Sequence, residues 1–484
     1  MKILENLKPY DVFKYFEELS QIPRGSGNEK AVSDYLVNFG KELGLETIQD
    51  KALNVIIKKP ATPGYENAPS VIIQGHMDMV CEKNKDTIHD FKKDPLKLRV
   101  EDDYIYATGT TLGADNGIAL AYAMAILASK DLKHPAIEML ATTDEETGMS
   151  GVMAVKPENL SGSILLNIDS EEEGKLLVSC AGGVRTNVSL DIRWQNIKEN
   201  EVPVEIVIRG LKGGHSGMEI DKERGNSNKL MGRILNDLLN HFKFNLVSIN
   251  GGSKNNAIPR ECDVVLALSK NNVNEVKEVI EKWNEILKNE LAMHDSNVRV
   301  EFKELNEKIE KVFSDDTTFK TIKILHLIPN GVDTMSMAIK GLVQSSTNLG
   351  VVTTKDNTVE FDSATRSSIA SLKDELVERT KNVAEILGAK FVANASYPEW
   401  QYNPDSEIRE IFQKVYEDMT GEEPEIIAIH AGLECGLLGE KIKGLDMISF
   451  GPNIYDVHTP NEHLSISSTE HVWDLLVKVL ATIK

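Results

Sequence analysis

The chain has 484 residues and a formal net charge of −21, with 41% hydrophobic and 27% charged residues. This length exceeds one ordinary hydrophobic core, so two or three domains are expected, and the composition is typical of a globular protein. The strongly negative charge excludes a nucleic-acid partner, because nucleic acids bind to basic surfaces.

The four cysteines are scattered along the chain without a C-x-x-C pair, which indicates a reducing compartment and no disulfide framework. The N-terminal stretch is charged throughout and lacks the apolar core of a signal peptide. The longest apolar run, residues 118–128, is too short to span a bilayer. We therefore expect a cytoplasmic protein with no membrane partner.

The N-terminal part of the chain shows helical and strand patterns in turn. Amphipathic spacing predicts two helices within residues 10–43, separated by a Pro/Gly break at 23–27. A strongly apolar helix is expected to start near Asn116. Helices that alternate with apolar strands indicate a mostly parallel sheet with crossover helices. Apolar runs predict four such strands, over residues 54–58, 71–75, 136–141 and 163–168.

Polar side chains directly follow three of these strands. His76 and Asp78 come after the second strand, and they point to the same face of an extended chain because they are two residues apart. Acidic residues 144–146 follow the third strand, and Asp169 follows the fourth. Open α/β sheets place their sites at the carboxyl ends of strands, so we expect a functional site there.

The chain changes character near residue 183. Polar and apolar residues then alternate in the strands, as in an antiparallel sheet with one exposed face. The order β-α-β-β-α-β is that of a ferredoxin-like unit, and it recurs up to residue 396 if a strand at 185–194 supplies the first strand of a second unit. The first unit comprises strand 204–210, helix 226–241, strands 244–250 and 261–269, helix 272–292 and strand 297–304.

An α/β pattern returns from Pro404 to the end of the chain. We therefore expect an α/β catalytic domain with a mostly parallel sheet, made of residues 1–183 and 399–484. Residues 184–398 are expected to form an inserted α+β lid domain built from ferredoxin-like units.

Five His and carboxylate side chains of the α/β part are candidates for binding two metal ions. Zinc takes His and carboxylate ligands, and two-metal hydrolases need a carboxylate that bridges ions about 3.5–4 Å apart. One bridging carboxylate, plus one His and one carboxylate per ion, uses all five candidates. Two Zn²⁺ ions, three carboxylates and one hydroxide are together neutral. The candidates are His76, Asp115, Glu146, Asp169 and His458.

Two further acidic residues fit supporting roles at such a site. Glu145 adjoins one of the candidate ligands and could face the bridging water, so it is the natural general base. Asp78 is placed to accept a hydrogen bond from the second ring nitrogen of His76, which would fix the tautomer of the imidazole.

Taken singly, each candidate also has a structural interpretation. Asp115 could cap a helix, residues 144–146 could be the acidic start of a helix, and His463 rivals His458 as a ligand. Their joint occurrence at strand ends favours the metal site. No Ser or Cys lies in a nucleophile-elbow context, and the H-E-x-x-H motif of single-zinc proteases is absent.

The motifs resemble, in the same order along the chain, those of the M20 family of dizinc metallopeptidases. They are H-M-D at 76–78, G-A-D-N-G at 113–117, D-E-E-T-G at 144–148, the strand-end Asp169 and H-T-P-N-E at 458–462. Three further stretches are similar to the aminoacyl-histidine dipeptidase branch of this family. These are I-P-R-G-S-G-N-E at 22–29, S-S-T-N-L-G at 345–350 and H-A-G-L-E-C-G at 430–436.

The resemblance implies how the five candidates divide between two zinc ions. Asp115 would bridge both ions, and the peptide bond that follows it would be cis. His76 and Asp169 would bind one ion, and Glu146 and His458 the other. Mn²⁺ or Co²⁺ could replace zinc, because imidazole and carboxylate ligands accept several metals.

The resemblance also implies Glu145 as the base, Asp78 as the partner of His76, and substrate contacts from the insert. His215, in G-G-H-S-G at 213–217, would stabilise the oxyanion. In smaller relatives this His comes from a partner subunit, and a doubled insert could supply it within one chain, so a monomer and a homodimer are both compatible. The candidates for binding substrate are Asn256, Arg260 and Arg366 for its carboxylate, and His430, which could instead cap a loop.

The implied function is metal-dependent hydrolysis of dipeptides, Xaa-His and others, by water activated between two zinc ions. The alternative on the same fold is an amidohydrolase that removes an N-acyl group from an amino acid. A non-enzymatic relative without metals is the third hypothesis, and the intact set of ligands and base argues against it.

Overall fold

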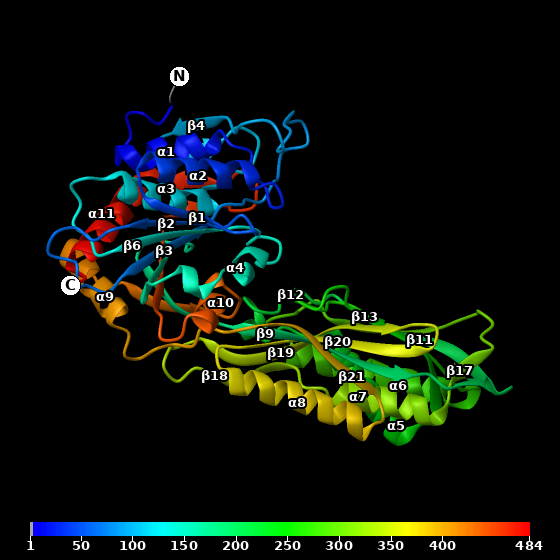
Figure 1. Ribbon diagram of the computed structural model, residues 1–484. Coiled ribbons are helices and arrows are strands. Elements are labelled where there is room, and N and C mark those ends of the chain that lie inside the picture. The colour runs from blue at the N-terminus through cyan, green and yellow to red at the C-terminus, as the bar shows by residue number, and fades with distance from the viewer. Residues whose placement is uncertain (1–2) are drawn as a thin grey trace. The chain divides into compact units, whose positions relative to one another are not determined.

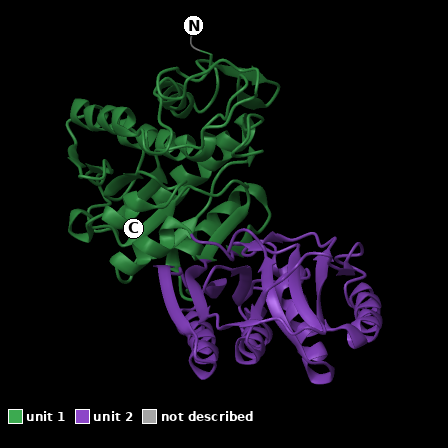
Figure 2. Cartoon of the chain, turned by 90° about the vertical axis from the view of Figure 1, so that its right-hand side faces the viewer, with its two compact units in different colours: residues 1–179, 402–428, 433–484 green, residues 180–401, 429–432 purple. Residues whose placement is uncertain are grey.

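The computed structural model describes residues 3–484, so residues 1 and 2 of the predicted first segment lie outside the described residues (Figure 1). The chain forms two compact units (Figure 2). No helix within the described part is long and apolar enough to cross a membrane. Unit 1 contains residues 1–179, 402–428 and 433–484, and unit 2 contains residues 180–401 and 429–432.

Unit 2 takes in the insert expected at 184–398 and, in addition, the short stretch 429–432. That stretch lies within the segment 399–484 that was expected to belong wholly to the catalytic domain. His430 is therefore part of unit 2, while the rest of the C-terminal segment from residue 402 onward returns to unit 1.

Unit 1 is built on an eight-stranded sheet with the order β1-β2-β6-β3-β7-β23-β8-β22. The strands from β6 to β23 are parallel, whereas β1, β2 and β8 pair antiparallel with neighbours. The predicted parallel sheet is thus the centre of a mixed sheet. The strands are β1 Glu46–Gln49, β2 Val55–Lys59, β3 Val71–His76, β6 Ile137–Thr142, β7 Ile164–Asn167, β8 Lys175–Cys180, β22 Glu425–Ile429 and β23 Asp446–Ser449.

The centre of this sheet is apolar because helices cover both of its faces. β3, β6 and β7 are buried along their whole length, which is why each reads as a continuous apolar run. Helices α1 to α3 lie on one face and α4 and α10 on the other (Figure 1). The helices are α1 Tyr10–Ser20, α2 Lys30–Glu42, α3 Ala114–Ala128, α4 Ser150–Ala154, α9 Glu407–Thr420, α10 Glu434–Lys441 and α11 Ile466–Thr482.

A small four-stranded sheet in unit 1 has the order β24-β25-β5-β4. Its strands are β4 Leu98–Glu101, β5 Tyr104–Ala107, β24 Ile454–Tyr455 and β25 His463–Ser465. The loop between β24 and β25 carries His458. This sheet therefore ties the C-terminal loop to the segment just ahead of α3.

Unit 2 contains a nine-stranded sheet whose two halves are both ferredoxin-like. The half β16-β11-β15-β13 places the first of its four strands, β11, between the fourth and the third, which is the ferredoxin-like order. The half β21-β9-β20-β19 repeats this order with β9 as its first strand. Antiparallel pairing of β13 with β19 joins the two halves. The predicted fold class is confirmed, and the first half is inserted between β9 and α7 of the second.

The bounds in unit 2 stay close to the predicted ones. The strands of the large sheet are β9 Gly182–Asp191, β11 Glu201–Arg209, β13 Phe244–Gly251, β15 Cys262–Ser269, β16 Arg299–Glu304, β18 Gly331–Met335, β19 Val343–Thr354, β20 Thr358–Ser367 and β21 Lys390–Tyr397. The helices are α5 Ser227–His241, α6 Val273–Glu290, α7 Asp315–Leu327 and α8 Ala370–Ile386. Two short pairs complete the unit, β10 Trp194–Asn196 with β17 Lys311–Phe313, and β12 Gly214–His215 with β14 Ala257–Ile258.

Candidate metal centre

Three parallel strands of unit 1 bring His and carboxylate side chains to one edge of the sheet. His76 is the last residue of β3, Glu146 lies in the turn after β6, and Asp169 follows β7. β3 pairs with both β6 and β7, so the carboxyl ends of the three strands are adjacent. The strand-end pattern in the sequence thus corresponds to one place in the structure.

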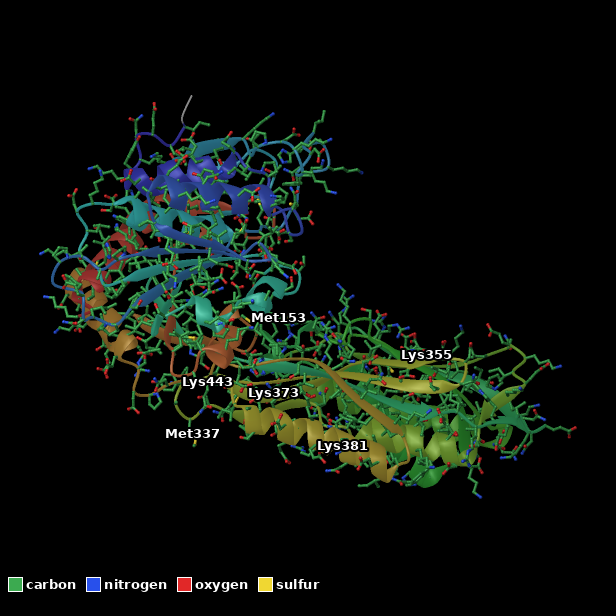
Figure 3. All side chains as sticks on the ribbon, viewed as in Figure 1. Met153, Met337, Lys355, Lys373, Lys381 and Lys443 are labelled. Atoms are coloured by element: carbon green, nitrogen blue, oxygen red, sulfur yellow. The ribbon has the colours of Figure 1, made fainter. Side chains whose placement is uncertain are left out.

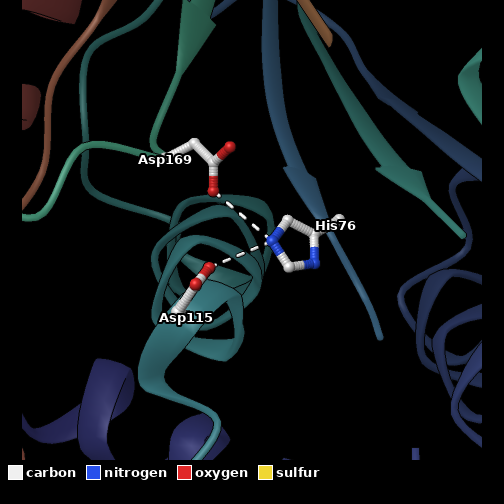
Figure 4. Close-up of side chains that lie close together, drawn as sticks. All are labelled: His76, Asp115 and Asp169. Atoms are coloured by element: carbon white, nitrogen blue, oxygen red, sulfur yellow. Dashed lines mark hydrogen bonds and ion pairs between the residues drawn. The ribbon is translucent and has the colours of Figure 1, made fainter. Parts of the chain in front are cut away.

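The five candidate ligands form two groups that share Asp115. His76 Nε2 lies 3.0 Å from Asp115 Oδ1 and 3.4 Å from Asp169 Oδ1 (Figure 4). His458 Nε2 lies 3.1 Å from Asp115 Oδ2 and 3.0 Å from Glu146 Oε1. The two oxygens of the Asp115 carboxylate therefore face different histidines. Within each group the potential ligand atoms lie within 4.8 Å of one another.

The backbone around Asp115 departs from a regular helix. α3 is interrupted at Asp115 and Asn116, which have non-helical torsion angles, and the peptide bond between them is cis, as the resemblance implied. The side chain of Asn116 donates to the carbonyl of Ile168 at 2.7 Å and accepts from the amide of His76 at 3.2 Å. The loop bearing Asp115 is thereby fixed against β3 and the end of β7.

Asp78 orients His76 and also binds the turn after β6. Its Oδ1 lies 3.3 Å from His76 Nδ1, which leaves Nε2 facing Asp115 and Asp169. Its two oxygens accept the backbone amides of Glu145 and Glu146 at 3.1 and 3.3 Å. A further hydrogen bond comes from the Ser26 hydroxyl at 2.8 Å. Asp78 therefore links the ends of β3 and β6.

The carboxylates create a strong negative potential at both histidines. Burial disfavours a charged His76, but the hydrogen bonds that its ring donates to Asp115 and Asp169 outweigh burial and hold the pKa of His76 well above its usual range. Hydrogen bonds to Asp115 and Glu146 raise the pKa of His458 to about 10. A cluster that retains protons so strongly is equally suited to bind a divalent cation, which competes for the same nitrogens.

The donor set fits two divalent cations. Each group offers one imidazole nitrogen and two carboxylate oxygens, one of them from the shared Asp115, and this is a set that zinc accepts. A fourth position is left for water or substrate on each ion, as catalytic sites require. His76 is 1% exposed and His458 is 48% exposed, so the second group lies nearer to solvent.

Glu145 lies beside this cluster without belonging to either group. With His76 and Glu146 it forms a third set of potential ligand atoms that lie within 4.8 Å of one another, and this set does not include Asp115. Burial, together with the neighbouring carboxylates of Asp169, Glu434 and Glu146, raises the pKa of Glu145 to about 9 in the absence of cations.

Sequence reasoning missed the buried charges that surround the Asp115 loop. Arg24, from the I-P-R-G-S-G-N-E stretch, donates to backbone carbonyls of this region. Glu462, the last residue of H-T-P-N-E, accepts backbone amides of residues 112–115. The only signal in the sequence was that both residues fall within stretches carrying the family resemblance.

In unit 2, His215 lies on the short strand β12, next to β14. Its Nδ1 accepts the backbone amides of Gly217 and Met218 at 3.3 and 3.1 Å, so the hydrogen of the neutral ring is on Nε2. Burial, and then the charge of Arg366, lowers the pKa of His215. The ring is therefore a neutral donor through Nε2.

Arg366, His430 and His215 are neighbours within unit 2. A Cβ atom at Gly217 would lie 2.6 Å from the carbonyl oxygen of His430 and 3.1 Å from the ring of His215. His430 forms a 2.7 Å hydrogen bond with Ser346, and burial followed by the charge of Arg366 lowers the pKa of His430 to about 3. Both imidazoles are thus neutral near a guanidinium group.

Tyr397, which sequence reasoning did not single out, holds Arg366. Its hydroxyl accepts a 2.8 Å hydrogen bond from Arg366 Nη1. Its ring fills the space above Gly183 and Gly432, since a Cβ atom there would lie 2.5 and 2.7 Å from ring atoms. Lys373 on α8 (Figure 3) donates to the carbonyl of Tyr397 at 3.2 Å and so fixes the end of β21.

The other two predicted substrate residues, Asn256 and Arg260, flank the short strand β14 in the sequence. The carbonyl of Asn256 accepts the amide of Ser216, which places Asn256 beside His215. Arg260 lines a different cavity of about 310 Å³, which is also lined by Asn250 and Asp263 and does not include His215. The structure therefore groups Asn256, but not Arg260, with the other candidates of unit 2.

Comparison with known proteins gives consistent results over nearly the whole chain. Residues 72–482 match the peptidase family M20/M25/M40. The cytosol non-specific dipeptidase of Escherichia coli (strain K12) is 39% identical over 484 residues, which cover 100% of this chain and 99% of that protein. The structure of aminoacylhistidine dipeptidase from Vibrio alginolyticus superposes with a TM-score of 0.96 at 41% identity, covering 99% of this chain and 98% of that one. Aminopeptidase PepT from Bacillus cereus ATCC 10987 shares the fold, with a TM-score of 0.58 at 16% identity over 99% of each chain.

Proposed function

This chain belongs to peptidase family M20/M25/M40 and is a peptide hydrolase, and we propose that it hydrolyses dipeptides, Xaa-His among them, with two divalent cations bound by unit 1. Enzymes of this family are metal-dependent. The observation that carries the proposal is the pair of ligand groups that share Asp115, because a bridging carboxylate is what a two-metal hydrolase needs.

In this proposal zinc is the resident metal, and two ions are bound per chain. His76 and Asp169 would hold one ion and His458 and Glu146 the other, and Asp115 would be shared by the two. When bound, the ions polarise the substrate carbonyl and lower the pKa of both a water molecule and Glu145.

The chain's own residues then divide the chemistry among them. Glu145 is placed beside the cluster to accept the proton of the attacking water and to pass it to the leaving amine. Asp78 holds the His76 ring so that Nε2 faces the ions. His215 presents a neutral Nε2–H group, which is the donor that a developing oxyanion requires.

The substrate carboxylate is proposed to bind to Arg366, whose guanidinium group is held by Tyr397. His430 lies near this group, and Asn256 lies beside His215. Arg260 is a weaker candidate because it lines a separate cavity. The metal-site residues act on an amide bond, and Arg366 and its neighbours bind a carboxylate. A dipeptide carries both groups, so both sets of residues favour the same substrate class.

The doubled insert leads to a proposal about where His215 acts. The two ferredoxin-like halves of unit 2 are joined edge to edge through β13 and β19. The half that contains β12 and β14 could take the place of a partner subunit, so that His215 serves its own chain. Specific activity that is independent of concentration in a verified monomer would support this proposal, and activity confined to a dimer would refute it.

We also place the enzyme in the cytosol. The name of the Escherichia coli relative and the scattered spacing of the four cysteines, with no C-x-x-C pair, support that location.

The test is hydrolysis of β-alanyl-histidine, Gly-His and Leu-Gly, measured beside an N-acetyl amino acid. The wild type, the chelated protein and Glu145→Ala are assayed together. Cleavage of the dipeptides only, lost in both controls, is the expected result. Cleavage of the acylated amino acid alone would make the protein an amidohydrolase of the same fold, and inactivity of the metal-loaded protein would refute the function.

A further inference from the structure

We propose that Arg24 and Glu462 are positioning residues that fix the loop bearing Asp115 and thereby set the affinity of the site for its second cation. The inference rests on the proposed two-metal function. It concerns two buried charges that contact no candidate ligand side chain and act through the backbone. The distances on both sides of the loop carry the argument.

Glu462 binds one side of the loop through its carboxylate. Its Oε2 accepts the amides of Leu112 and Gly113 at 2.7 and 2.9 Å. Its Oε1 accepts the amide of Ala114 at 2.8 Å and that of Asp115 at 3.4 Å. Four successive backbone donors thus converge on one carboxylate that is 2% exposed. Because each oxygen accepts two backbone amides, the carboxylate fixes the path of the backbone into Asp115.

Arg24 binds the other side of the same loop. Its Nη2 donates to the carbonyl of Gly113, and its Nη1 donates to the carbonyls of Met77 and Asp78 at 3.1 and 3.2 Å. Arg24 is 2% exposed. The guanidinium group therefore joins the Asp115 loop to the residues that directly follow His76.

Two glycines make room for Arg24. A Cβ atom at Gly113 would lie 2.6 Å from Arg24 Nη2, and one at Gly117 would lie 2.5 Å from the same atom. Gly113 also has a φ of 66°, which disfavours any side chain. The motif G-A-D-N-G therefore carries its glycines where the buried arginine approaches the start of α3.

The two residues connect three of the five metal-binding segments. Glu462 follows His458 by four residues in the loop between β24 and β25, so it couples that loop to Asp115. Arg24 couples the Asp115 loop to the end of β3. A bridging carboxylate must present each oxygen in a defined direction, and side chains behind the ligands are known to supply that precision.

The second cation should be the one that depends on this pair. His76 and Asp169 follow buried central strands, so one ion keeps two ligands on a rigid sheet. The other ion relies on His458, which is 48% exposed, has a φ of 61° and lies in a loop. If Asp115 is misplaced, both groups lose their shared ligand. The first group then keeps two ligands beside central strands, whereas the second keeps Glu146, in the turn after β6, and the loop residue His458.

The test measures zinc stoichiometry and both dissociation constants in the full chain by competition with a chromophoric chelator. The variants are Glu462→Gln, which keeps the shape but leaves one carbonyl oxygen, and Glu462→Asp, which keeps the charge but is shorter. Glu138→Gln is the matched control. Glu138 is also 2% exposed and accepts the amides of Ser161 and Gly162 at 2.8 and 2.9 Å, but it lies at the start of β6, away from the ligands.

Glu462→Gln is expected to bind the first ion like the wild type and the second ion about 10–100-fold more weakly. Its activity should be low at limiting zinc and should recover at excess zinc. The affinity of Glu462→Asp for the second ion should lie between those of the wild type and Glu462→Gln. If Glu462→Gln is recovered unfolded, Glu462→Asp provides the test. Glu138→Gln should lower the melting temperature of the metal-free protein and leave both zinc affinities unchanged.

Wild-type affinity for the second ion in the folded Glu462 variants would overturn the inference. An equal loss in Glu138→Gln would also overturn it, because the effect would then be general destabilisation. Failure of the wild type to bind two ions is a separate outcome, which refutes the two-metal function and not merely the role of Glu462.

Discussion

The two units place their polar groups by different means. In unit 1 three of the five candidate ligands lie at the ends of buried parallel strands, and buried charges hold the backbone around Asp115. In unit 2 His215 lies on a two-residue strand and Arg366 is held by one aromatic hydroxyl. We therefore expect the two units to have different roles in catalysis. Changes in unit 1 should alter metal binding or the chemical step, whereas changes in unit 2 should leave the metals in place.

The largest effect is expected from Glu145→Gln in unit 1. Removing the general base should lower kcat by about 10²–10⁴-fold, while both ions remain bound because Glu145 belongs to neither of the two groups that share Asp115. Steady-state kinetics on a dipeptide, with metal analysis of the same sample, checks this. A variant that lost its zinc would show that Glu145 is a ligand and would refute the assignment.

His215→Ala tests whether a residue of unit 2 takes part in the chemical step. Loss of one donor to an oxyanion typically costs about 10²–10³-fold in kcat, and we expect that loss with an unchanged zinc content. His215→Gln restores a donor and should recover part of the activity. If the alanine variant changed only KM, His215 would be a binding residue and the proposed role would be wrong.

Gly183→Ala tests substrate binding by Arg366, and its expected effect on the kinetics is smaller. The new Cβ atom would meet the Tyr397 ring at 2.5 Å and displace the hydroxyl that holds Arg366. We expect KM for dipeptides to rise about tenfold, the scale of one charge-assisted hydrogen bond, with zinc content unchanged. Tyr397→Phe, which removes only the hydroxyl, should raise KM in the same direction. Unchanged KM in both variants would exclude Arg366 from carboxylate binding.

The smallest effect is a dependence on pH in the metal-free protein. The pKa of His458 is raised to about 10 by Asp115 and Glu146, so its protonation stabilises unit 1 fully below the unfolded value of about 6.5. This stabilisation is lost as the pH rises towards the folded value. Zinc takes the place of the proton, so the rise in melting temperature on adding zinc should grow between about pH 6.5 and 9. If zinc raised the melting temperature by the same amount throughout this pH range, the proposed binding of zinc by His458 would be contradicted.

The sequence was sufficient for the features that depend on local pattern. The apolar runs followed by His76, Glu146 and Asp169 predicted that these residues lie close together, because parallel strands bring their carboxyl ends together. The alternation of polar and apolar residues likewise predicted the two ferredoxin-like halves of unit 2. Both predictions depend on periodicities that a single segment carries by itself.

The features that escaped sequence analysis depend on contacts between distant segments. Arg24 and Glu462 resemble ordinary surface charges in the sequence, and only the folded chain shows that both are buried around Gly113. The space that Gly183 leaves for Tyr397 is equally invisible, because the two residues are far apart in the sequence. The short helix α10 was missed because its glycines weaken the helical pattern.

The most direct test of the central claim is anomalous diffraction from zinc-loaded crystals at the zinc absorption edge. Two peaks are expected about 3.5–4 Å apart, one beside His76 and Asp169 and one beside His458 and Glu146, with Asp115 between them. A single peak, or two peaks that do not share Asp115, would contradict the account of a carboxylate-bridged pair of ions.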